Sequence, residues 1–202
     1  MSTTTPADTS EVRDHILATG QRLMAGRGYS AVGLNEILTS AGVPKGSFYH
    51  YFSSKDAFGE ALLHSYFDDY LAEIDATLAQ PGQSMAQRLI SYFEAWRDNQ
   101  SFLDCQGKCL AVKMAAEVAD LSEAMRLAMK RGTSGIVSRL TKAIEGGVAE
   151  GSLAIDGDAG STAQSLYQLW LGSSVMVKVE RDGAPFDTAM RTTRQILHLP
   201  PE

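Results

Sequence analysis

Apolar residues along the chain recur at every third or fourth position, which is the spacing of one face of an α-helix. A first segment with this spacing covers residues 9–27, with apolar positions at Val12, Ile16, Leu17, Leu23 and Met24. A second one follows Ser53, with apolar positions at Phe58, Leu62, Tyr66, Tyr70, Ile74 and Leu78. No segment alternates apolar and polar residues as a half-buried strand does. The pattern therefore predicts an all-α protein.

Capping residues mark the starts of further helices. Ser84 and Gln87 have the spacing of a capping box, in which each side chain bonds to the backbone N–H of the other residue. Asp120 and Glu123 repeat this spacing. We therefore expect helices to begin directly after Ser84 and after Asp120. Later segments with helical spacing are 158–181 and 186–198.

Two short helical segments surround a glycine turn. The first, residues 34–41, reads LNEILTSA and stops at Gly42, a residue able to take the left-handed conformation that a tight turn needs. Pro44 opens the second segment, consistent with the preference of proline for a first helical turn. Two short helices joined in this way predict a helix-turn-helix.

The second helix of a helix-turn-helix lies in the major groove of DNA, with residues near its start at base edges. Here these positions hold Lys45, Gly46 and Ser47. Lysine binds guanine acceptors or phosphate, glycine permits close approach of the backbone, and serine contacts either partner. Further polar tips belong to Tyr49, His50 and Tyr51. Phe48 and Phe52 are four residues apart and are expected in the protein interior. The alternative interpretation of this segment is a helix that is packed in a core and does not contact DNA.

Charge restricts any nucleic-acid contact to a small surface. The chain has a net charge of −6, and its first 60 residues hold five Lys or Arg against six Asp or Glu. The stretch 39–54 has no acidic residue, and basic side chains lie in or beside it: Lys45, His50 and Lys55. Lys55 is expected in the first turn of the next helix, where backbone amides also attract phosphate. The sequence thus predicts a local basic spot on a neutral lobe.

Composition excludes several other classes of protein. With 44% hydrophobic and 21% charged residues, the chain can bury a core and is not a disordered tail. No window holds the roughly 18 apolar residues that span a bilayer, and no signal peptide is recognisable. We therefore expect a cytoplasmic protein without membrane contact. Cys105 and Cys109 are read as thiols, and with no histidine within thirty residues they predict no metal site and no cofactor.

A longer motif, AGVxxGxxYxxFxxK, is matched by Ala41-Gly42-Val43, Gly46, Tyr49, Phe52 and Lys55. Through this motif residues 10–60 resemble the TetR family of transcriptional regulators. The resemblance implies an all-helical homodimer with a three-helix DNA-binding domain, residues 9–56, and a helical sensing and dimerisation domain, residues 57–202. It also implies DNA contacts at Asn35, Lys45, Gly46, Ser47, Tyr49, His50, Tyr51 and Lys55. Val32-Gly33 departs from the hydroxyl residues with which many members start the second helix, so a cap is lost.

Cys109 is the candidate sensor. A helix that begins near Gly107 places it in the first turn, four residues before Lys113, and helix N-termini and cations lower the pKa of a thiol. A small buried hydrophobe is the alternative interpretation on spacing alone. The segments GLNEIL, PKGSFYHYF, CLAVK, AEVADLSEAMR and LWLG are similar to the N-ethylmaleimide-reductase repressor branch of the family, which senses electrophiles and oxidants through cysteine. This resemblance favours Cys109 over Cys105.

Lys178 is a second candidate in the sensing lobe. It continues a largely apolar stripe through Tyr167 and Leu171. The default interpretation is a lysine near the end of a helix, where the helix dipole favours a cation. The alternative is that Lys178 faces the sensor thiolate and either lowers its pKa or is modified with it.

The sequence therefore predicts a homodimeric repressor, not an enzyme. It is expected to bind a near-palindromic operator in double-stranded DNA and to be released when Cys109 reacts with a small electrophile or oxidant. Two alternatives stay open. A reversible apolar inducer replaces thiol chemistry in the first, with a pocket near Trp96, Phe102 and Trp170. The second is a helical thiol-dependent peroxide-reducing enzyme, although two cysteines without a nearby histidine lack the usual base.

Overall fold

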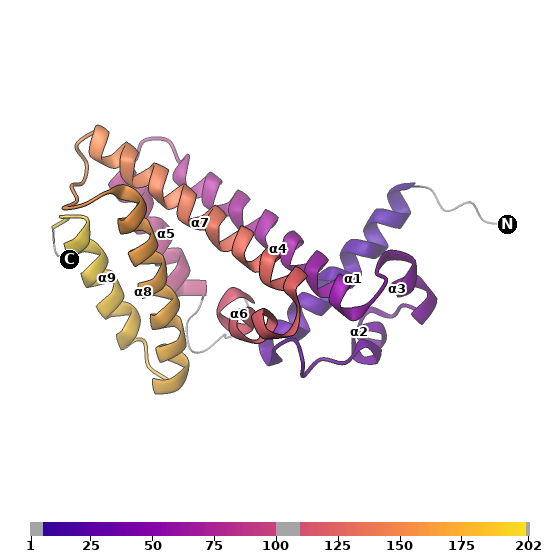
Figure 1. Cartoon of the computed structure of the whole chain (residues 1–202). Helices are drawn as coiled ribbons and strands as arrows, with labels where there is room; N and C mark the ends of the chain where they lie inside the picture. The colour runs from indigo at the N-terminus through magenta and orange to yellow at the C-terminus, as the bar shows by residue number, and fades with distance from the viewer. Residues whose placement is uncertain (1–5, 100–109, 201–202) are drawn as a thin grey trace. The chain divides into compact units, whose positions relative to one another are not determined.

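The structure, a computed structural model, describes residues 6–99 and 110–200. Every regular element in these two ranges is an α-helix, which confirms the predicted all-α fold (Figure 1). In chain order the helices are α1 (Pro6–Arg27), α2 (Leu34–Ala41), α3 (Lys45–Tyr51), α4 (Lys55–Leu78), α5 (Met85–Asn99), α6 (Leu110–Leu121), α7 (Glu123–Ala149), α8 (Ala159–Glu180) and α9 (Ala184–Ile196). Within the described part of the chain, no helix combines the length and the apolar composition that a membrane span requires.

The helices form two compact units. The amino-terminal unit contains α1, α2, α3 and α6, with α4 as far as Asp68 and α7 as far as Gly132. The carboxy-terminal unit contains α5, α8 and α9 with the remainder of α4 and α7. The boundary expected between residues 56 and 57 divides the chain by function and stays a prediction. In the structure, α6 belongs to the same compact unit as α1, α2 and α3.

Aromatic side chains from α3, from the residue that follows it and from α4 fill the core of the amino-terminal unit. Phe48 and Phe52 are buried, as predicted, and their ring centroids lie 5.1 Å apart. Phe58 of α4 completes the cluster, 5.4 Å from Phe48 and 5.1 Å from Phe52. With 7 residues, α3 is too short to persist by itself. Its stability therefore depends on these buried rings.

The turn between α2 and α3 has the predicted glycine geometry. Gly42 has a φ of 64° and a ψ of 28°, in the left-handed region, and its N–H donates to the carbonyl oxygen of Thr39 over 3.2 Å. The N–H of Val43 donates to the carbonyl oxygen of Leu38 over 3.1 Å. These bonds end α2, and α3 begins after Pro44. The helix-turn-helix prediction is confirmed.

Of the capping boxes predicted at Ser84 and at Asp120, the first is present. A third one, predicted for Ser53 and Asp56, is replaced by Ser54, whose Oγ accepts from the N–H of Ala57 over 3.0 Å. The N–H of Ser84 donates to Gln87 Oε1 over 2.8 Å, and the N–H of Gln87 donates to Ser84 Oγ over 3.3 Å. The prediction at Asp120 was wrong, because α6 continues through Asp120. Ser122 caps α7 instead, and its Oγ accepts from the N–H of Met125 over 3.4 Å. Serine and aspartate cap helices about equally well, so a neighbouring serine can take this role.

In the amino-terminal unit, α4 and α7 pack closely at a glycine. A Cβ added to Gly132 would lie 2.1 Å from Cγ of Phe67 and 2.2–2.4 Å from its two Cδ atoms. Phe67 itself is buried. Because non-bonded carbon atoms do not approach within 3.0 Å, only a residue without a side chain fits at this crossing.

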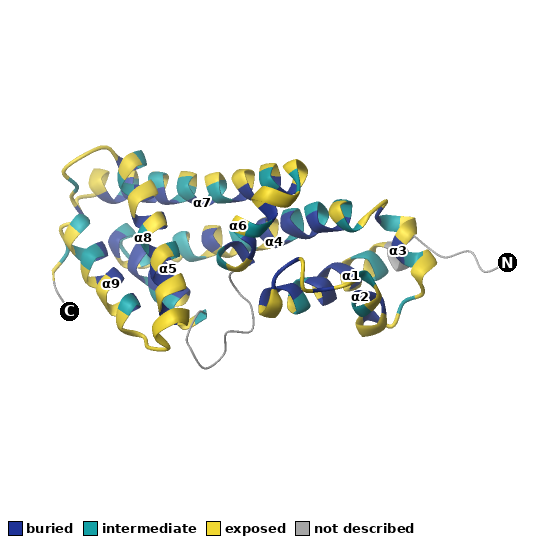
Figure 2. Ribbon diagram, turned by 60° about the horizontal axis from the view of Figure 1, so that its bottom comes forward, coloured by how far each residue is buried: buried dark blue, intermediate teal, exposed yellow. Residues whose placement is uncertain are grey.

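The core of the carboxy-terminal unit is built around Trp170. Its ring stacks between Phe93 of α5 and Phe186 of α9, with centroid distances of 4.8 and 5.6 Å and interplanar angles of 22° and 21°. The indole N–H of Trp170 donates to Thr193 Oγ1 over 2.9 Å. Figure 2 shows the buried residues of α5, α8 and α9 on the sides where these helices pack together.

Candidate nucleic-acid interface and sensing region

The short helix α3 turns one side to the protein interior and the other to solvent. Phe48 is buried, whereas Tyr49 is 49% exposed. Lys45, Gly46 and His50 are also exposed, and Ser47 and Tyr51 are intermediate. The Nζ of Lys45 lies 5.8 Å from the centroid of the Tyr49 ring, within range of a cation–π contact. Every α3 residue predicted to contact DNA is thus at least partly open to solvent, and we call this set, Lys45, Gly46, Ser47, Tyr49, His50 and Tyr51, the α3 contact face.

The surroundings of two predicted contact positions also favour an external partner. A Cβ added to Gly46 would meet no atom within 4 Å, so the fold itself does not require glycine there. Asn35 is exposed in the first turn of α2. The residue before this helix, Gly33, makes no side-chain cap, as the departure from the family pattern predicted. Both Gly46 and Asn35 are therefore placed where an external partner can reach them.

Lys55 has bonds within the protein. Its Nζ donates to the carbonyl oxygen of Tyr29 over 2.9 Å and lies 4.2 Å from the centroid of the Tyr29 ring. Burial lowers the pKa of the Lys55 ammonium, against the opposing effect of the Glu117 and Asp56 carboxylates. The Tyr29 hydroxyl donates to Asp56 Oδ1 over 2.7 Å. Lys55 and Asp56 therefore both hold Tyr29, and the phosphate contact expected of Lys55 stays a prediction.

Glu117 of α6 binds the turn between α1 and α2. Its Oε2 accepts from the N–H of Tyr29 over 2.9 Å, and its Oε1 accepts from the N–H of Ser30 over 2.7 Å. Burial raises the pKa of the Glu117 carboxyl, but hydrogen bonds from Ser30 and Tyr29 and the charge of Lys55 outweigh burial and hold that pKa below its usual value. Glu117 is therefore ionised at neutral pH. Gly28, with a φ of 90°, turns the chain so closely past Glu117 that a Cβ there would lie 2.8 Å from Oε2.

The contact of Glu117 was not predicted from the sequence. Glu117 is separated in the sequence from Tyr29 by 88 positions and from Ser30 by 87. The donors are backbone N–H groups, which every residue except proline provides. The one local signal is Gly28, which marks a turn but does not identify the partner of that turn.

The predicted sensor Cys109 lies outside the described residues, as do Cys105 and Phe102. Helix α6 begins at Leu110, the residue that follows Cys109 in the sequence. Lys178 is exposed in the last turn of α8, where the helix dipole favours a cation. A partnership between Lys178 and Cys109 therefore stays a prediction.

Trp96 and Trp170, predicted to line an apolar pocket, are core residues in the structure. Their exposed fractions are 4% and 0%. The indole N–H of Trp96 donates to Ser174 Oγ over 3.0 Å, so its one polar group also has a partner inside the protein. A ligand would have to displace Phe93 or Phe186 to reach the ring of Trp170. At Trp170 the predicted pocket is thus filled by protein side chains.

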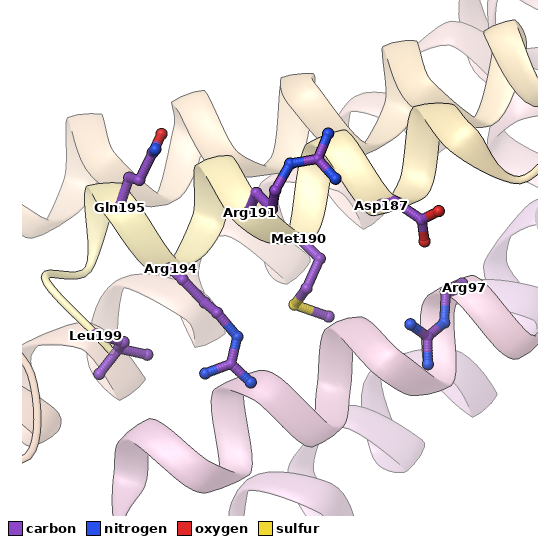
Figure 3. Close-up of a pocket in the computed structure, with 7 residues that line it drawn as sticks. All are labelled: Arg97, Asp187, Met190, Arg191, Arg194, Gln195 and Leu199. Atoms are coloured by element: carbon purple, nitrogen blue, oxygen red, sulfur yellow. The ribbon is translucent and has the colours of Figure 1, made fainter. Parts of the chain in front are cut away.

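The carboxy-terminal unit also carries a groove between α5 and α9, with a volume of about 510 Å³. Its lining residues are Arg97, Asp187, Met190, Arg191, Arg194, Gln195 and Leu199. In Figure 3 the side chains of Arg97, Arg194 and Met190 extend into the space between the two helices, and Arg191 extends away from it. The groove combines charged side chains with the apolar Met190 and Leu199. Among the described residues, no three His, Cys, Asp or Glu side chains gather as a metal site requires.

Two family descriptions match the chain. "Bacterial regulatory proteins, tetR family" matches residues 16–68, which contain α2 and α3. "Tetracyclin repressor-like, C-terminal domain" matches residues 86–193.

Characterised relatives cover nearly the whole chain. The HTH-type transcriptional repressor NemR of Escherichia coli K12 is 38% identical over 190 residues, which are 94% of this chain and 96% of the relative. The HTH-type transcriptional repressor DhaR of Mycobacterium sp. strain GP1 is 35% identical over 176 residues, which are 87% of each chain. The crystal structure of the reduced form of E. coli NemR is similar with a TM-score of 0.86 and 39% identity, and covers 95% of this chain and 100% of that one.

Proposed function

This chain belongs to the TetR family of regulatory proteins, and from that premise we propose that it is a transcriptional repressor released from DNA by thiol chemistry. TetR repressors bind operator DNA and act as dimers. In this proposal the homodimer binds a near-palindromic operator with its two α3 helices about one DNA turn apart. Reaction of Cys109 with an electrophile or oxidant then releases it.

The observation that carries the DNA proposal is the division of α3 into two sides. Phe48 holds the helix in the core, and the α3 contact face lies open on the opposite side. A helix that only filled a core would need neither the exposed Lys45 nor the exposed Tyr49. Gly46, which the fold does not require, is explained by close approach of a sugar-phosphate backbone.

An apolar surface on α8 supports a second copy of the chain as partner. Val175, Met176 and Val179 are 48%, 42% and 68% exposed. Neighbouring large apolar side chains in contact with water favour burial against a complementary surface. In a dimer with two-fold symmetry the same surface on each copy supplies that cover.

The thiol proposal is supported by the similarity of this chain to E. coli NemR, whose crystal structure is that of the reduced form. In this chain Cys109 immediately precedes α6 in the sequence. Release requires that the modified protein binds the operator more weakly than the unmodified one, because a reaction without such a difference shifts no equilibrium.

Lys45→Ala and Tyr49→Ala are each expected to weaken operator binding by about 1–3 kcal/mol, or roughly 5- to 150-fold. The operator is first selected from random duplexes, and affinity is then measured by fluorescence anisotropy. If Lys45 binds a phosphate, its variant also lowers the salt dependence of binding, by about one unit of slope. Lys142→Ala removes an exposed lysine from α7 and serves as the matched control. Unchanged affinity in both variants would exclude α3 as the recognition helix.

Cys109→Ser is expected to keep its operator affinity in the presence of N-ethylmaleimide, whereas the wild type and Cys105→Ser are released. The Cys109 thiolate adds to the maleimide double bond, the neighbouring carbon takes up a proton, and no group leaves. Anisotropy with and without the reagent follows the release, and mass spectrometry of the intact protein counts the adducts. If a quinone releases Cys109→Ser from the operator as readily as it releases the wild type, the alternative of a reversible inducer is favoured instead.

A further inference from the structure

Glu117 joins α6 to the loop that leads into the helix-turn-helix. Its two carboxylate oxygens accept from two successive backbone N–H groups, those of Tyr29 and Ser30. The chain then runs through three residues into α2 and from there into α3. Hydrogen bonds to a charged acceptor are shorter and stronger than neutral ones, and two of them from adjacent donors fix direction as well as distance. We call this contact the Glu117 clamp.

The loop held by the Glu117 clamp is attached to other elements as well. Lys55 at the start of α4 donates to the carbonyl oxygen of Tyr29, and Asp56 accepts from the Tyr29 hydroxyl. Tyr29 is therefore bonded through its N–H, its carbonyl oxygen and its hydroxyl, to residues of α6 and α4. A displacement of α6 along its axis must either break the Glu117 clamp or move the loop.

Glu117 lies eight residues after Cys109 in the sequence and seven after the first residue of α6. Two helical turns, about 11 Å, thus separate the start of α6 from the Glu117 clamp. An α-helix transmits an axial displacement over such a length with little deformation, because each turn is tied to the next by backbone hydrogen bonds.

We propose that Glu117 is the positioning residue through which α6 holds the helix-turn-helix in its DNA-binding arrangement, and that release of the operator includes loss of the Glu117 clamp. The first part concerns the unmodified protein alone. The second part rests on the proposed function, because it requires that modification of Cys109 displaces α6.

Three variants separate the clamp from charge and from general stability. Glu117→Gln removes the charge and presents an N–H₂ group to one of the two N–H donors, so that one bond is lost. Glu117→Asp keeps the charge but is one methylene shorter and cannot bond both donors from the same backbone position. Asp120→Asn removes an exposed carboxylate from the same helix and is the matched control. Circular dichroism melting establishes that each variant is folded at the temperature of measurement.

Operator affinity of the unmodified proteins tests the first part. Glu117→Gln and Glu117→Asp are expected to bind the operator about tenfold more weakly than the wild type, the effect of losing about one hydrogen bond to a charged group. Asp120→Asn is expected to match the wild type. Affinity within twofold of the wild type in both Glu117 variants would overturn the proposal. Wild-type affinity of Glu117→Asp alone would also overturn the proposal, because operator affinity would then depend on the charge of residue 117 and not on the geometry of the Glu117 clamp.

The coupling part is tested by a readout that simple destabilisation does not move. If modification of Cys109 weakens operator binding, the bound operator makes that modification less favourable by the same factor at equilibrium. We expect the operator also to slow alkylation of Cys109 by N-ethylmaleimide in the wild type, because it favours the arrangement of α6 in the unmodified protein. In Glu117→Gln two ratios are expected to fall toward one. They are the ratio of alkylation rates without and with the operator, and the ratio of operator affinities before and after alkylation. A weakened variant that keeps the wild-type ratio and protection would overturn the coupling role.

The two proposals fail in different ways. If the wild type is not released by N-ethylmaleimide, thiol sensing is wrong and coupling through Glu117 to Cys109 falls with it. The positioning role is then decided by the affinities of the unmodified proteins alone.

Discussion

Trp170→Ala is expected to lower the free energy of unfolding by about 3–5 kcal/mol, the range for removing a large aromatic side chain from a packed core. Trp170 is fully buried and stacks with both Phe93 and Phe186. Its loss leaves a cavity between α5 and α9 and removes the donor that bonds to Thr193. Urea denaturation at fixed protein concentration measures the effect, since stability of a dimer depends on concentration.

Two controls make the Trp170 result specific. Trp170→Phe keeps an aromatic ring and loses only the N–H and part of the volume, so it should cost less than the alanine variant. Val148→Ala shortens a side chain that is 44% exposed at the end of α7 and should change stability by less than about 0.5 kcal/mol. A Trp170→Ala protein within 1 kcal/mol of the wild type, well below the expected range, would show that the ring is not packed as described.

Gly132→Ala is expected to destabilise the protein by about 1–3 kcal/mol, although alanine is the better helix former. The new Cβ would lie 2.1 Å from Cγ of Phe67. Because Cγ is close to the backbone of α4, rotation of the ring cannot relieve the overlap, and the two helices must separate. The resulting loss of packing exceeds the gain of about 1 kcal/mol in helix propensity. Thermal and urea unfolding both measure this balance.

A second substitution tests the cause. Phe67→Leu is smaller at the crossing, so Gly132→Ala combined with Phe67→Leu should be more stable than the sum of the two single effects, as a double-mutant cycle will show. Gly26→Ala is the matched control, since a Cβ at Gly26 meets no atom within 4 Å. This control is expected to stabilise α1 by about 0.5–1 kcal/mol. Equal stability of Gly132→Ala and Gly26→Ala would contradict the close crossing of α4 and α7.

The organisation of α3 could be predicted from the sequence because two short-range rules agree there. Phe48 and Phe52 are four residues apart, which places them on one side of a helix, and Gly42 provides the left-handed turn before it. Both rules act within a few residues and need no knowledge of the rest of the chain. The helix-turn-helix motif was therefore recognisable before the fold was known.

Choices among equivalent neighbours could not be predicted. Asp120 and Ser122 are both good caps, and the end of α6 decides between them. Glu117 likewise stands on a helix that carries another carboxylate at Asp120, and only tertiary packing brings one of them to the loop after α1. Backbone N–H groups have no residue-type signature, so a contact with them leaves no pattern in the sequence.

The tryptophans show a different limit. Their rings suit either an apolar pocket or a core, and composition does not distinguish the two. Ser174 and Thr193 decide the outcome, because each supplies a hydroxyl oxygen for an indole N–H that would otherwise be buried without a partner. Those pairings span 78 and 23 residues. Only the assembled helices bring them together.

Placement of both tryptophans in one unit gives the protein a built-in optical probe. The chain has two tryptophans, and both belong to the carboxy-terminal unit, while the helix-turn-helix has none. Indole emission therefore follows the state of the carboxy-terminal unit alone. A tryptophan introduced on α3 would add a second, independent signal, so that binding of DNA and events in the carboxy-terminal unit can be timed against each other in one mixing experiment.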